Sequence, residues 1–371
     1  MPKVQVAVVA PSLDILGGQA IQAQRLLDGW HGSPEIEAWL VPVNPLPPEP
    51  LRFARRVKYL RTVVNELVYL PLLVRELARA DVVHVFSASY FSFLLAPLPA
   101  MSIARAFGKP IVLNYHSGEA PDHLRGSAVA RAAIRRADRT VVPSRFLRDV
   151  FAAFGIDATV VPNVVDVERF SFRLRDPLRP RILSTRNLES LYNVACTLRA
   201  FRVVQQSRND ATLTVVGSGS EEPRLRQLAR DLDLQHVTFT GRVDPGRIAE
   251  LYASHDIYVQ SPNIDNMPTS VLEAYASGLP VVSTEAGGVP AILTHGIHGL
   301  LAPLDDHHRL ASHVLALLAD PALARRVALG GRDACDAYTW TSVRDSWLRV
   351  YRSALADSAR ATAVVSRHAR P

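Results

Sequence analysis

Residues 257–290 read IYVQSPNIDNMPTSVLEAYASGLPVVSTEAGGVP, and this stretch contains a strand, a helix and a second strand in succession. A short β-branched run ends at Gln260, and Pro268 stands where proline is typical of the first turn of a helix. A second β-branched run follows at 280–283. This order predicts parallel strands joined by a crossover helix.

The same alternation extends over the rest of the chain in two series. The predicted strands are 4–10, 37–43, 82–86, 111–114 and 140–143 in the first series, and 181–184, 211–216, 237–240, 257–260 and 280–283 in the second. Helical patterns lie between them, as at 51–79 and 123–137. The fold class expected is α/β, with two facing Rossmann-like domains and ligands at the carboxyl ends of the strands, in a cleft between the domains.

The domain boundaries follow from the breaks in this pattern. We expect an N-terminal domain at 1–170, a linker at 171–180 in a charged, proline-bounded run, and a C-terminal domain at 181–340. A final helix at 341–357 has an apolar stripe with Trp347 and Tyr351, so we expect it to pack back on the N-terminal domain. The tail 358–371 is expected to fray.

Size and composition favour a globular, two-domain protein. The chain has 371 residues, 48% hydrophobic and 21% charged, which suits two domains of roughly 150 to 200 residues each. Met1-Pro2-Lys3 leads directly into the first strand without signal-peptide features, and the apolar region 89–106 is interrupted by prolines, so no transmembrane segment is expected. Cys196 and Cys335 are too few for a disulfide framework or a zinc site, which favours a cytoplasmic location.

Residues 52–61 combine basic and apolar side chains. The net charge of +7 is compatible with nucleic acid, anionic membranes or acidic ligands. No nucleic-acid module accompanies it, so nucleic acid is not an expected partner. The segment 52–61 is either an ordinary solvated helix face or a peripheral contact with the inner membrane face, and its residues are Arg52, Phe53, Arg55, Arg56, Val57, Lys58, Tyr59, Leu60 and Arg61.

The helix that begins near Pro268 has the features of an anion site. Its free amides and the positive end of its dipole favour a phosphate, and Thr269 and Ser270 add hydroxyl donors there. Glu273, one turn further on, can accept hydrogen bonds from vicinal hydroxyls, as carboxylates do with ribose. Phosphate and ribose together indicate a nucleotide.

The whole stretch resembles the donor-binding motif of the retaining GT-B glycosyltransferases of family 4 (glycosyl transferases group 1). The resemblance lies in two acidic residues eight apart, an alanine-rich helix, Gly-x-Pro-Val-Val and a Gly-Gly pair. It continues over nearly the whole chain; the matching positions are Gly17-Gly18, His116, Ser144, Val161–Asp166, Arg186, Val216–Gly219, Asp265, Glu273, Gly278–Val282 and Gly287-Gly288.

This resemblance implies a function and a role for each site residue. The expected activity is metal-independent, retaining transfer of a hexose from a nucleotide-diphosphate sugar to a glycan, lipid-linked or small-molecule acceptor, with no cofactor. His116, Arg186 and Asp265 would be catalytic. His116 would act near the reacting carbon, Arg186 would stabilise the leaving phosphate, and Asp265 would bind the transferred sugar. The donor-binding set is Gly17, Gly18, Arg186, Asn266, Met267, Thr269, Ser270 and Glu273.

The sequence departs from the family pattern at the donor site. Asp265 stands where the family usually has Glu, and Asn266 and Pro268 replace two glycines, so the sugar cannot be inferred. The lysine that usually follows the arginine is absent, and Leu191, Tyr192 and Asn193 occupy its place. A non-catalytic sugar-nucleotide-binding protein and a sugar-nucleotide epimerase of the same fold therefore stay open as alternatives.

Three further motifs are given structural interpretations. Asp231-Leu232-Asp233 ends an amphipathic helix and should point both carboxylates outward, so no metal site is expected there. Gly217-Ser218-Gly219 lacks the third glycine of a dinucleotide fingerprint. His295, His298, His307 and His308 are expected in turns or on the surface.

Overall fold

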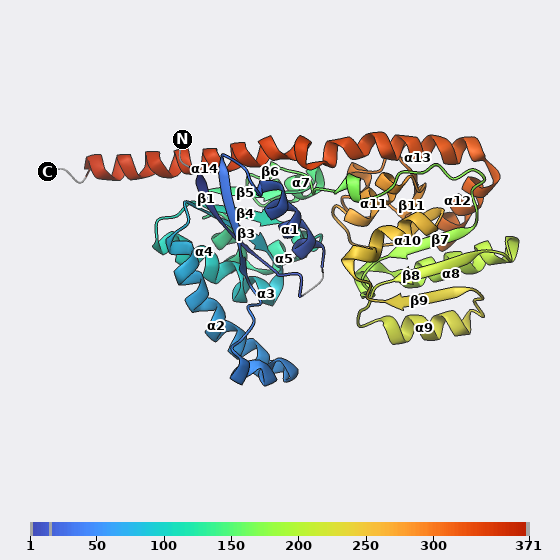
Figure 1. Ribbon diagram of the computed structural model, residues 1–371, viewed down its shortest axis with the longest axis horizontal. Coiled ribbons are helices and arrows are strands. Elements are labelled where there is room, and N and C mark those ends of the chain that lie inside the picture. Colours follow the sequence, from blue (N-terminus) through green and yellow to red (C-terminus); the bar gives the residue numbers. More distant parts are fainter. Residues whose placement is uncertain (1–2, 15–16, 369–371) are drawn as a thin grey trace. The chain divides into compact units, whose positions relative to one another are not determined.

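The computed structural model describes residues 3–14 and 17–368, and the side chains of 54–56, 58 and 361–368 lie outside the description. The chain divides into two compact units (Figure 1). Unit 1 comprises Met1–Val164 and Val343–Pro371, and unit 2 comprises Val165–Ser342.

Unit 1 contains a six-stranded parallel sheet with the order β2-β1-β3-β4-β5-β6. Its strands are β1 Val4–Ala10, β2 Ile36–Pro42, β3 Val82–Ser87, β4 Ile111–Tyr115, β5 Arg139–Val142 and β6 Thr159–Val160. The helices are α1 Gly18–Trp30, η1 Glu49–Arg56, α2 Lys58–Ala78, α3 Tyr90–Leu95, α4 Pro97–Ala106, α5 Ala120–Gly126, α6 Ala128–Ile134, α7 Arg145–Ala153 and, in large part, α14 Trp340–His368.

The two faces of this sheet differ in chemistry. Alternate residues of a strand point to opposite faces, so Val83, Val85 and Leu113 contribute to an apolar core that also includes Tyr69 and Leu73 of α2. His84, Phe86 and Asn114 occupy the other face, where they are also buried. The buried polar side chains of His84 and Asn114 therefore lie on the same face of the sheet.

Helix α14 covers part of this polar face. Tyr351 Oη lies 2.8 Å from His84 Nδ1, and the ring of Trp347 lies 4.8 Å from the ring of His84. Arg139, from β5, donates to Asp357 near the end of the buried stripe. The expected packing of this helix on the N-terminal domain is thus confirmed.

Helix α14 continues past Asp357 to His368, where we expected a frayed tail. The added segment, SARATAVVSRH, contains alanine and arginine but no glycine or proline, so no residue in it opposes helix formation strongly. Residues 369–371 lie outside the described part of the chain. Among the described residues, no helix is long and apolar enough to cross a bilayer.

Unit 2 contains a second six-stranded parallel sheet, with the order β12-β11-β10-β7-β8-β9. Its strands are β7 Arg181–Thr185, β8 Thr212–Val216, β9 Val237–Gly241, β10 Ile257–Gln260, β11 Val281–Thr284 and β12 Leu300–Ala302. Its helices are η2 Val167–Arg169, η3 Ser190–Tyr192, α8 Val194–Ser207, α9 Glu222–Asp231, η4 Pro245–Arg247, α10 Ile248–Ser254, α11 Thr269–Ser277, η5 Val289–Ala291, α12 His307–Ala319, α13 Pro321–Cys335 and η6 Asp336–Tyr338.

Several elements differ from the sequence prediction. Strands β6 and β12 were not predicted, because runs of two and three residues carry too little pattern. The single helix expected at 51–79 is η1 followed by α2. The helix expected at 123–137 is α5 and α6, divided where Ser127 caps α6 by accepting a hydrogen bond from the Ala130 amide.

The segment expected to be a linker, 171–180, is part of unit 2. The side chain of Arg175 is buried and donates to the carbonyl oxygens of Tyr252, His255 and Ser277. Asp256 lies 3.9 Å away and is 1% exposed. Burial lowers the pKa of Arg175 to about 10, so it stays charged at neutral pH. One arginine thus connects this segment to the C-terminal ends of α10 and α11.

Replacing Arg175 with Met is expected to destabilise unit 2 by about 3–5 kcal/mol, because buried carbonyl groups lose their donor and Asp256 loses a nearby cation. Urea denaturation followed by circular dichroism measures the loss. Arg179→Met is the matched control, since Arg179 is exposed in the same segment. Equal stability of the two variants would contradict this account.

Candidate functional site

Arg186 is the centre of a polar cluster in unit 2, directly after β7. Its Nη2 atom donates to Asp265 Oδ2 at 2.6 Å and its Nη1 atom donates to Ser270 Oγ at 3.2 Å. The ring centroid of Tyr192 lies 4.0 Å from the guanidinium carbon. The structure thus brings Arg186 together with Asp265 and Ser270, which lie 79 and 84 residues later in the sequence.

Both members of this ion pair are nearly buried. The side chain of Arg186 is 10% exposed and that of Asp265 is 11% exposed. Burial raises the pKa of Asp265, although Arg186 and the Asn266 amide act in the opposite direction. Burial alone would lower the pKa of Arg186, but Asp265 and three tyrosines raise it. A charged guanidinium is therefore held in surroundings of low polarity, where it acts strongly on a nearby anion.

The loop from β10 to α11 carries Asp265, Asn266 and Met267. Pro268 is the N-cap residue of α11 rather than its first residue, and the proline side chain makes no capping hydrogen bond. Thr269 and Ser270 form the first turn of the helix, where the sequence predicts an anion site. Asn266 and Met267 are buried at this end of the helix.

Glu273 lies one turn into α11 and is 8% exposed. Burial and, next, the charge of Glu273 raise the pKa of the Tyr252 phenol well above its usual value. Tyr252 Oη also lies 2.8 Å from Thr185 Oγ1 and donates to the carbonyl of Ser270. This tyrosine joins the start of α11 to the end of β7.

Three glycines allow the loops of this cluster to approach one another. A Cβ on Gly217, where φ is +133°, would lie 2.1 Å from the carbonyl oxygen of Arg186. A Cβ on Gly219 would lie 2.3 Å from the carbonyl oxygen of Leu188, and one on Gly288 would lie 2.0 Å from that of Asn266. Gly217 and Gly219 therefore support the Arg186 loop by close backbone contact.

His116, Gly17 and Gly18 belong to unit 1, at the carboxyl edge of its sheet. Gly17 is the N-cap of α1 and has extended backbone, and a Cβ on either glycine would meet nothing within 4 Å. No steric contact among the described residues therefore requires glycine at these two positions. Residues 15 and 16, just before them, lie outside the description.

The His116 ring stacks on Phe86, with ring centres 5.2 Å apart, and Phe86 stacks on His84 at 5.0 Å. Burial lowers the pKa of His116 to about 4 and that of His84 to about 3. Both imidazoles are consequently neutral at pH 7, so His116 can donate or accept a hydrogen bond but carries no positive charge.

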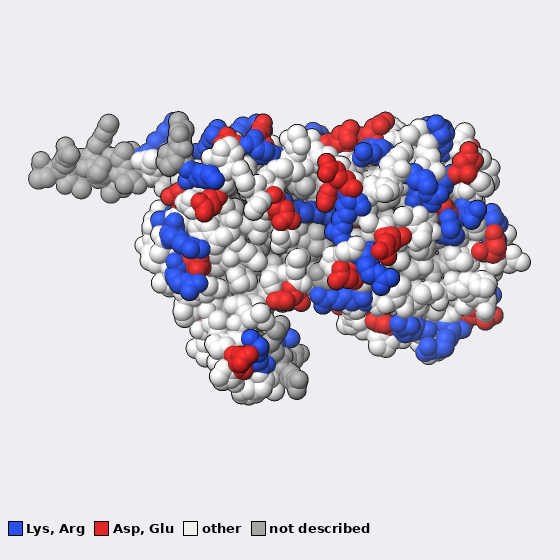
Figure 2. Space-filling model, in the orientation of Figure 1, with Lys and Arg blue, Asp and Glu red and all other residues white. Residues whose placement is uncertain are grey.

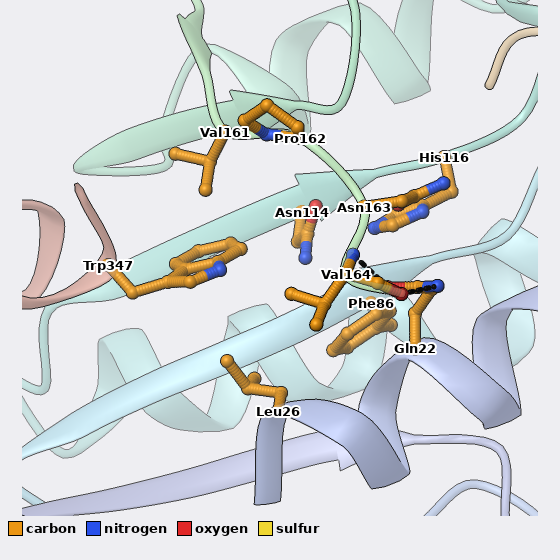
Figure 3. Close-up of a pocket in the computed structure, with 10 residues that line it drawn as sticks. All are labelled: Gln22, Leu26, Phe86, Asn114, His116, Val161, Pro162, Asn163, Val164 and Trp347. Carbon is orange, nitrogen blue, oxygen red and sulfur yellow. Dashed lines mark hydrogen bonds between the residues drawn. The ribbon is translucent and has the colours of Figure 1, made fainter. Parts of the chain in front are cut away.

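A small cavity of about 10 Å³ adjoins His116 (Figure 3). Its size corresponds to a single water molecule. Gln22 of α1 forms two hydrogen bonds with the backbone of Val164, at 2.8 and 2.9 Å, drawn as dashed lines in Figure 3. These bonds hold the segment 161–164 over His116. The cavity is lined by Gln22, Leu26, Phe86, Asn114, His116, Val161, Pro162, Asn163, Val164 and Trp347.

The motifs that we interpreted as structural have ordinary surroundings. Asp231 and Asp233 are exposed at the end of α9. His295 Nδ1 accepts a hydrogen bond from the Leu301 amide in a turn. Within residues 3–14 and 17–368, no group of three or more His, Cys, Asp or Glu side chains is arranged to hold a metal ion.

Sequence reasoning did not identify Tyr252, Gln260 or the contact of Tyr192 with Arg186. Gln260 is fully buried and accepts a hydrogen bond from Ser270 at 3.4 Å, while its Nε2 atom donates to Ser283. A buried glutamine at the end of an apolar strand was the available signal for its role. The tyrosines gave no such signal, because aromatic residues are common in cores.

Comparison with known proteins gives matches over most of the chain. A family profile described as Glycosyltransferase Family 4 matches residues 3–169, and one described as Glycosyl transferases group 1 matches residues 179–320. A GDP-mannose-dependent alpha-mannosyltransferase of Mycobacterium tuberculosis is 30% identical over 294 residues, 74% of this chain and 73% of that protein. A phosphatidyl-myo-inositol mannosyltransferase of Mycobacterium leprae is 29% identical over 285 residues, 74% of this chain and 73% of that protein.

Two solved structures have the same fold. HepE of Anabaena, in complex with UDP and glucose, superposes with a TM-score of 0.73 at 18% identity and covers 94% of this chain and 100% of its own. Sucrose-phosphate synthase of Thermosynechococcus elongatus gives 0.74 at 18% identity, over 96% and 100% of the two chains. The predicted fold, with two Rossmann-like units of the GT-B type, is confirmed.

The low pKa values of His84 and His116 predict a loss of stability in acid. Unfolded histidine titrates near pH 6.5, so between about pH 6.5 and 4 the unfolded chain binds protons that native unit 1 excludes. Each histidine then lowers the free energy of unfolding by up to about 1.4 kcal/mol per pH unit. Urea titrations at pH 7, 6 and 5 measure this slope.

The slope should be shallower in His116→Gln and in His84→Gln. His31→Gln is the control, because His31 is exposed in the same unit. If the wild type and all three variants lost stability at the same rate with falling pH, the buried histidines would not be neutral in the native state.

Proposed function

The chain belongs to glycosyltransferase family 4 and is a glycosyltransferase. We propose that it transfers a sugar from a nucleotide-diphosphate sugar, with retention of configuration and without a metal. The acceptor is a glycan or a lipid-linked molecule. The observation that carries the proposal is the contact of Arg186 with Asp265 and Ser270 at the start of α11, with Glu273 one turn further on.

The donor diphosphate fits the anion-binding features of unit 2. Arg186 and the first turn of α11 supply a cation, backbone amides and the hydroxyl groups of Thr269 and Ser270. Glu273 supplies a carboxylate for the ribose hydroxyls, and Asp265, Asn266 and Met267 line the loop that leads to the sugar. Tyr252 and the glycines hold these groups in place before the donor binds.

Departure of the nucleoside diphosphate places growing negative charge on its terminal phosphate. Arg186 is fixed by two hydrogen bonds, so it can stabilise that charge in the transition state without first reorganising. In unit 1, we assign to neutral His116 a hydrogen bond with the sugar, and to the backbone of Gly17 and Gly18 the approach to the diphosphate. A Cβ is sterically allowed at both glycines, so Gly18→Ala should fold normally.

The relatives support this class of donor and acceptor. The mannosyltransferase of M. tuberculosis is named as GDP-mannose-dependent, HepE is solved with UDP, and the M. leprae enzyme is named for a phosphatidyl-myo-inositol acceptor. The candidates for the donor are therefore GDP- and UDP-sugars. A lipid-linked acceptor made at the inner membrane face agrees with a cytoplasmic location for this chain.

Arg186→Ala and Glu273→Ala are expected to lower transfer or hydrolysis of the donor by about 10²–10³-fold, the range seen when one stabilising group is removed from a charged transition state. The assay measures release of UDP or GDP from UDP-glucose and GDP-mannose. Glu250→Ala is the control, because its side chain is 70% exposed on α10. Full activity of both site variants would exclude the assignment.

A thermal-shift screen separates catalysis from the two alternatives. A ligand that binds only the native state raises its stability, by about 2.7 kcal/mol at a hundred times its Kd. UDP-, GDP- and ADP-sugars are compared, and the one that stabilises the wild type but not Glu273→Ala is the donor. Stabilisation without any product would favour a sugar-nucleotide sensor, and an altered free sugar nucleotide would favour an epimerase.

We infer that α2 and η1 contact a membrane surface. Helix α2 has a buried face with Tyr69, Leu73 and Leu77, yet it also exposes apolar side chains at three- and four-residue spacings along its length. Figure 2 shows this surface as largely uncharged, with charges at the η1 end. The exposed apolar residues of η1 and α2 are Leu51, Phe53, Tyr59, Leu60, Val63, Leu67, Leu70 and Val74, with Val57 between the two helices.

Basic residues flank this exposed apolar face. The side chain of Arg52 is 56% exposed, and Arg61 is also exposed. The side chains of Arg55, Arg56 and Lys58, part of the predicted contact, lie outside the described residues. Each basic residue near an anionic bilayer contributes about 1 kcal/mol of binding, while apolar side chains enter the interface.

Vesicle sedimentation tests the membrane contact. Binding to vesicles with anionic lipid should weaken by about 2 kcal/mol when Arg52 and Arg61 are both replaced by Ala, and it should fall with added salt. Val63→Ser with Leu67→Gln should weaken binding at every salt concentration. Arg224→Ala is the control, an exposed arginine of unit 2. Wild-type protein that fails to sediment with anionic vesicles would contradict this inference.

A further inference from the structure

The guanidinium of Arg186 is held from three directions by side chains of unit 2. Asp265 accepts from Nη2 at 2.6 Å, Ser270 accepts from Nη1 at 3.2 Å, and the Tyr192 ring covers the guanidinium at 4.0 Å. The Nε atom is buried and has no hydrogen-bond partner within the described part of the chain. The two hydrogen bonds use two of the five N–H donors of the group, so donors are left for a ligand.

The position of Tyr192 is determined by a tight turn. The 3-10 helix η3 ends at Tyr192, and Asn193 follows with a left-handed backbone, φ 43°. The carbonyl of Leu191 accepts hydrogen bonds from the amides of Asn263, at 2.9 Å, and Ile264, at 3.3 Å. This turn is therefore attached to the loop that carries Asp265.

A second pair of bonds strengthens the attachment. Asn193 Nδ2 donates to Asn263 Oδ1 at 3.2 Å and to Asp305 Oδ1 at 2.9 Å. The turn that presents the Tyr192 ring and the loop that presents the Asp265 carboxylate consequently form one connected structure. Arg186 lies in contact with both of them.

The Tyr192 ring attracts the guanidinium of Arg186 without adding a negative charge, unlike a further carboxylate. Its π face attracts the cation, and this attraction strengthens where water is excluded, as it is for a side chain that is 10% exposed. The ring carries no net charge, and its π face is a much weaker hydrogen-bond acceptor than a carboxylate oxygen. It can therefore fix the plane of the guanidinium while its hydrogen-bond donors stay available to phosphate oxygens.

We propose that Tyr192 is a positioning residue for the donor diphosphate, acting through Arg186 by holding the plane of its guanidinium with the aromatic ring. This rests on the proposed function, in which Arg186 contacts the diphosphate. Tyr192 stands in the part of the sequence where the family usually has a lysine, so an uncharged ring lies beside Arg186 in place of a second cation.

The first test compares Tyr192→Phe with Tyr192→Leu. Loss of the ring should weaken binding of UDP and GDP about tenfold in calorimetry and lower kcat/KM for the sugar nucleotide by a similar factor. Tyr192→Phe keeps the ring and should stay within about twofold of the wild type, and the acceptor KM should not change in either variant. Phe239→Leu is the matched control, since it removes a ring 4.8 Å from Arg226 elsewhere in unit 2 and should leave nucleotide binding unchanged.

The second test does not depend on the folding of the Leu variant. Incorporation of Phe, monofluoro-Phe and trifluoro-Phe at position 192 keeps the shape of the ring and weakens its π face in steps. Affinity for UDP or GDP should fall at each step if the ring acts on the cation. Equal affinity across the series would overturn the proposal, as would wild-type affinity in Tyr192→Leu.

The outcomes separate this proposal from the proposed function. If Arg186→Ala binds and turns over sugar nucleotides like the wild type, the proposed function fails. If Arg186→Ala is impaired while Tyr192→Leu is not, only the role of Tyr192 fails. In the Arg186→Ala background, Tyr192→Leu should cause no further loss, because the ring acts through the guanidinium.

Discussion

The ion pair of Arg186 and Asp265 is the interaction on which the rest of the candidate site depends. Both side chains are close to nine-tenths buried, and a charge in such surroundings is costly unless it is paired and hydrogen-bonded. The pair meets this condition only because loops from three strand ends of unit 2 converge on it. Gly217, Gly219 and Gly288 allow that convergence, since a side chain at any of them would enter the space of a neighbouring carbonyl.

In unit 1, the main constraint is that buried polar side chains of the sheet need hydrogen-bond partners. His84, Asn114 and Phe86 occupy the buried face beneath α14, and every polar atom there needs a partner. Tyr351 and Asn114 contact the two nitrogens of His84, at 2.8 and 3.1 Å. His116 lies at the end of the stack that begins with this bonded ring. Its neutrality and its orientation thus share one cause, which is burial against aromatic neighbours.

The sequence predicts those elements whose pattern lies within one short stretch of residues. Val4–Ala10 and Ile257–Gln260 were predicted with correct bounds, because continuous β-branched runs are typical of buried parallel strands. Strand β6 was missed because two residues have no periodicity, and Ser127 divides a helix by a capping bond that the apolar pattern does not reveal. Arg186 and Asp265 were identified by family resemblance and Ser270 by its place in the first turn of a helix, whereas the contacts of Arg186 with the other two join positions 79 and 84 residues apart. Tyr192 was noted only as a residue in place of a lysine, since nothing local indicates that its ring covers Arg186.

Beside Arg186, further positive potential for a diphosphate can come from groups of unit 2 that carry no net charge. The start of α11 contributes part of this potential, because the first turn of a helix is the positive end of its dipole and the N-cap residue, Pro268, makes no capping hydrogen bond with its side chain. Asp265 lowers the net charge of the pair to zero, so the affinity for phosphate depends on how the guanidinium donors and the helix amides are oriented. Orientation in turn depends on Ser270, which belongs to the first turn of α11 and also accepts from Arg186. A single hydroxyl group therefore couples the cation to the helix, and a shift of either one changes the position of the other.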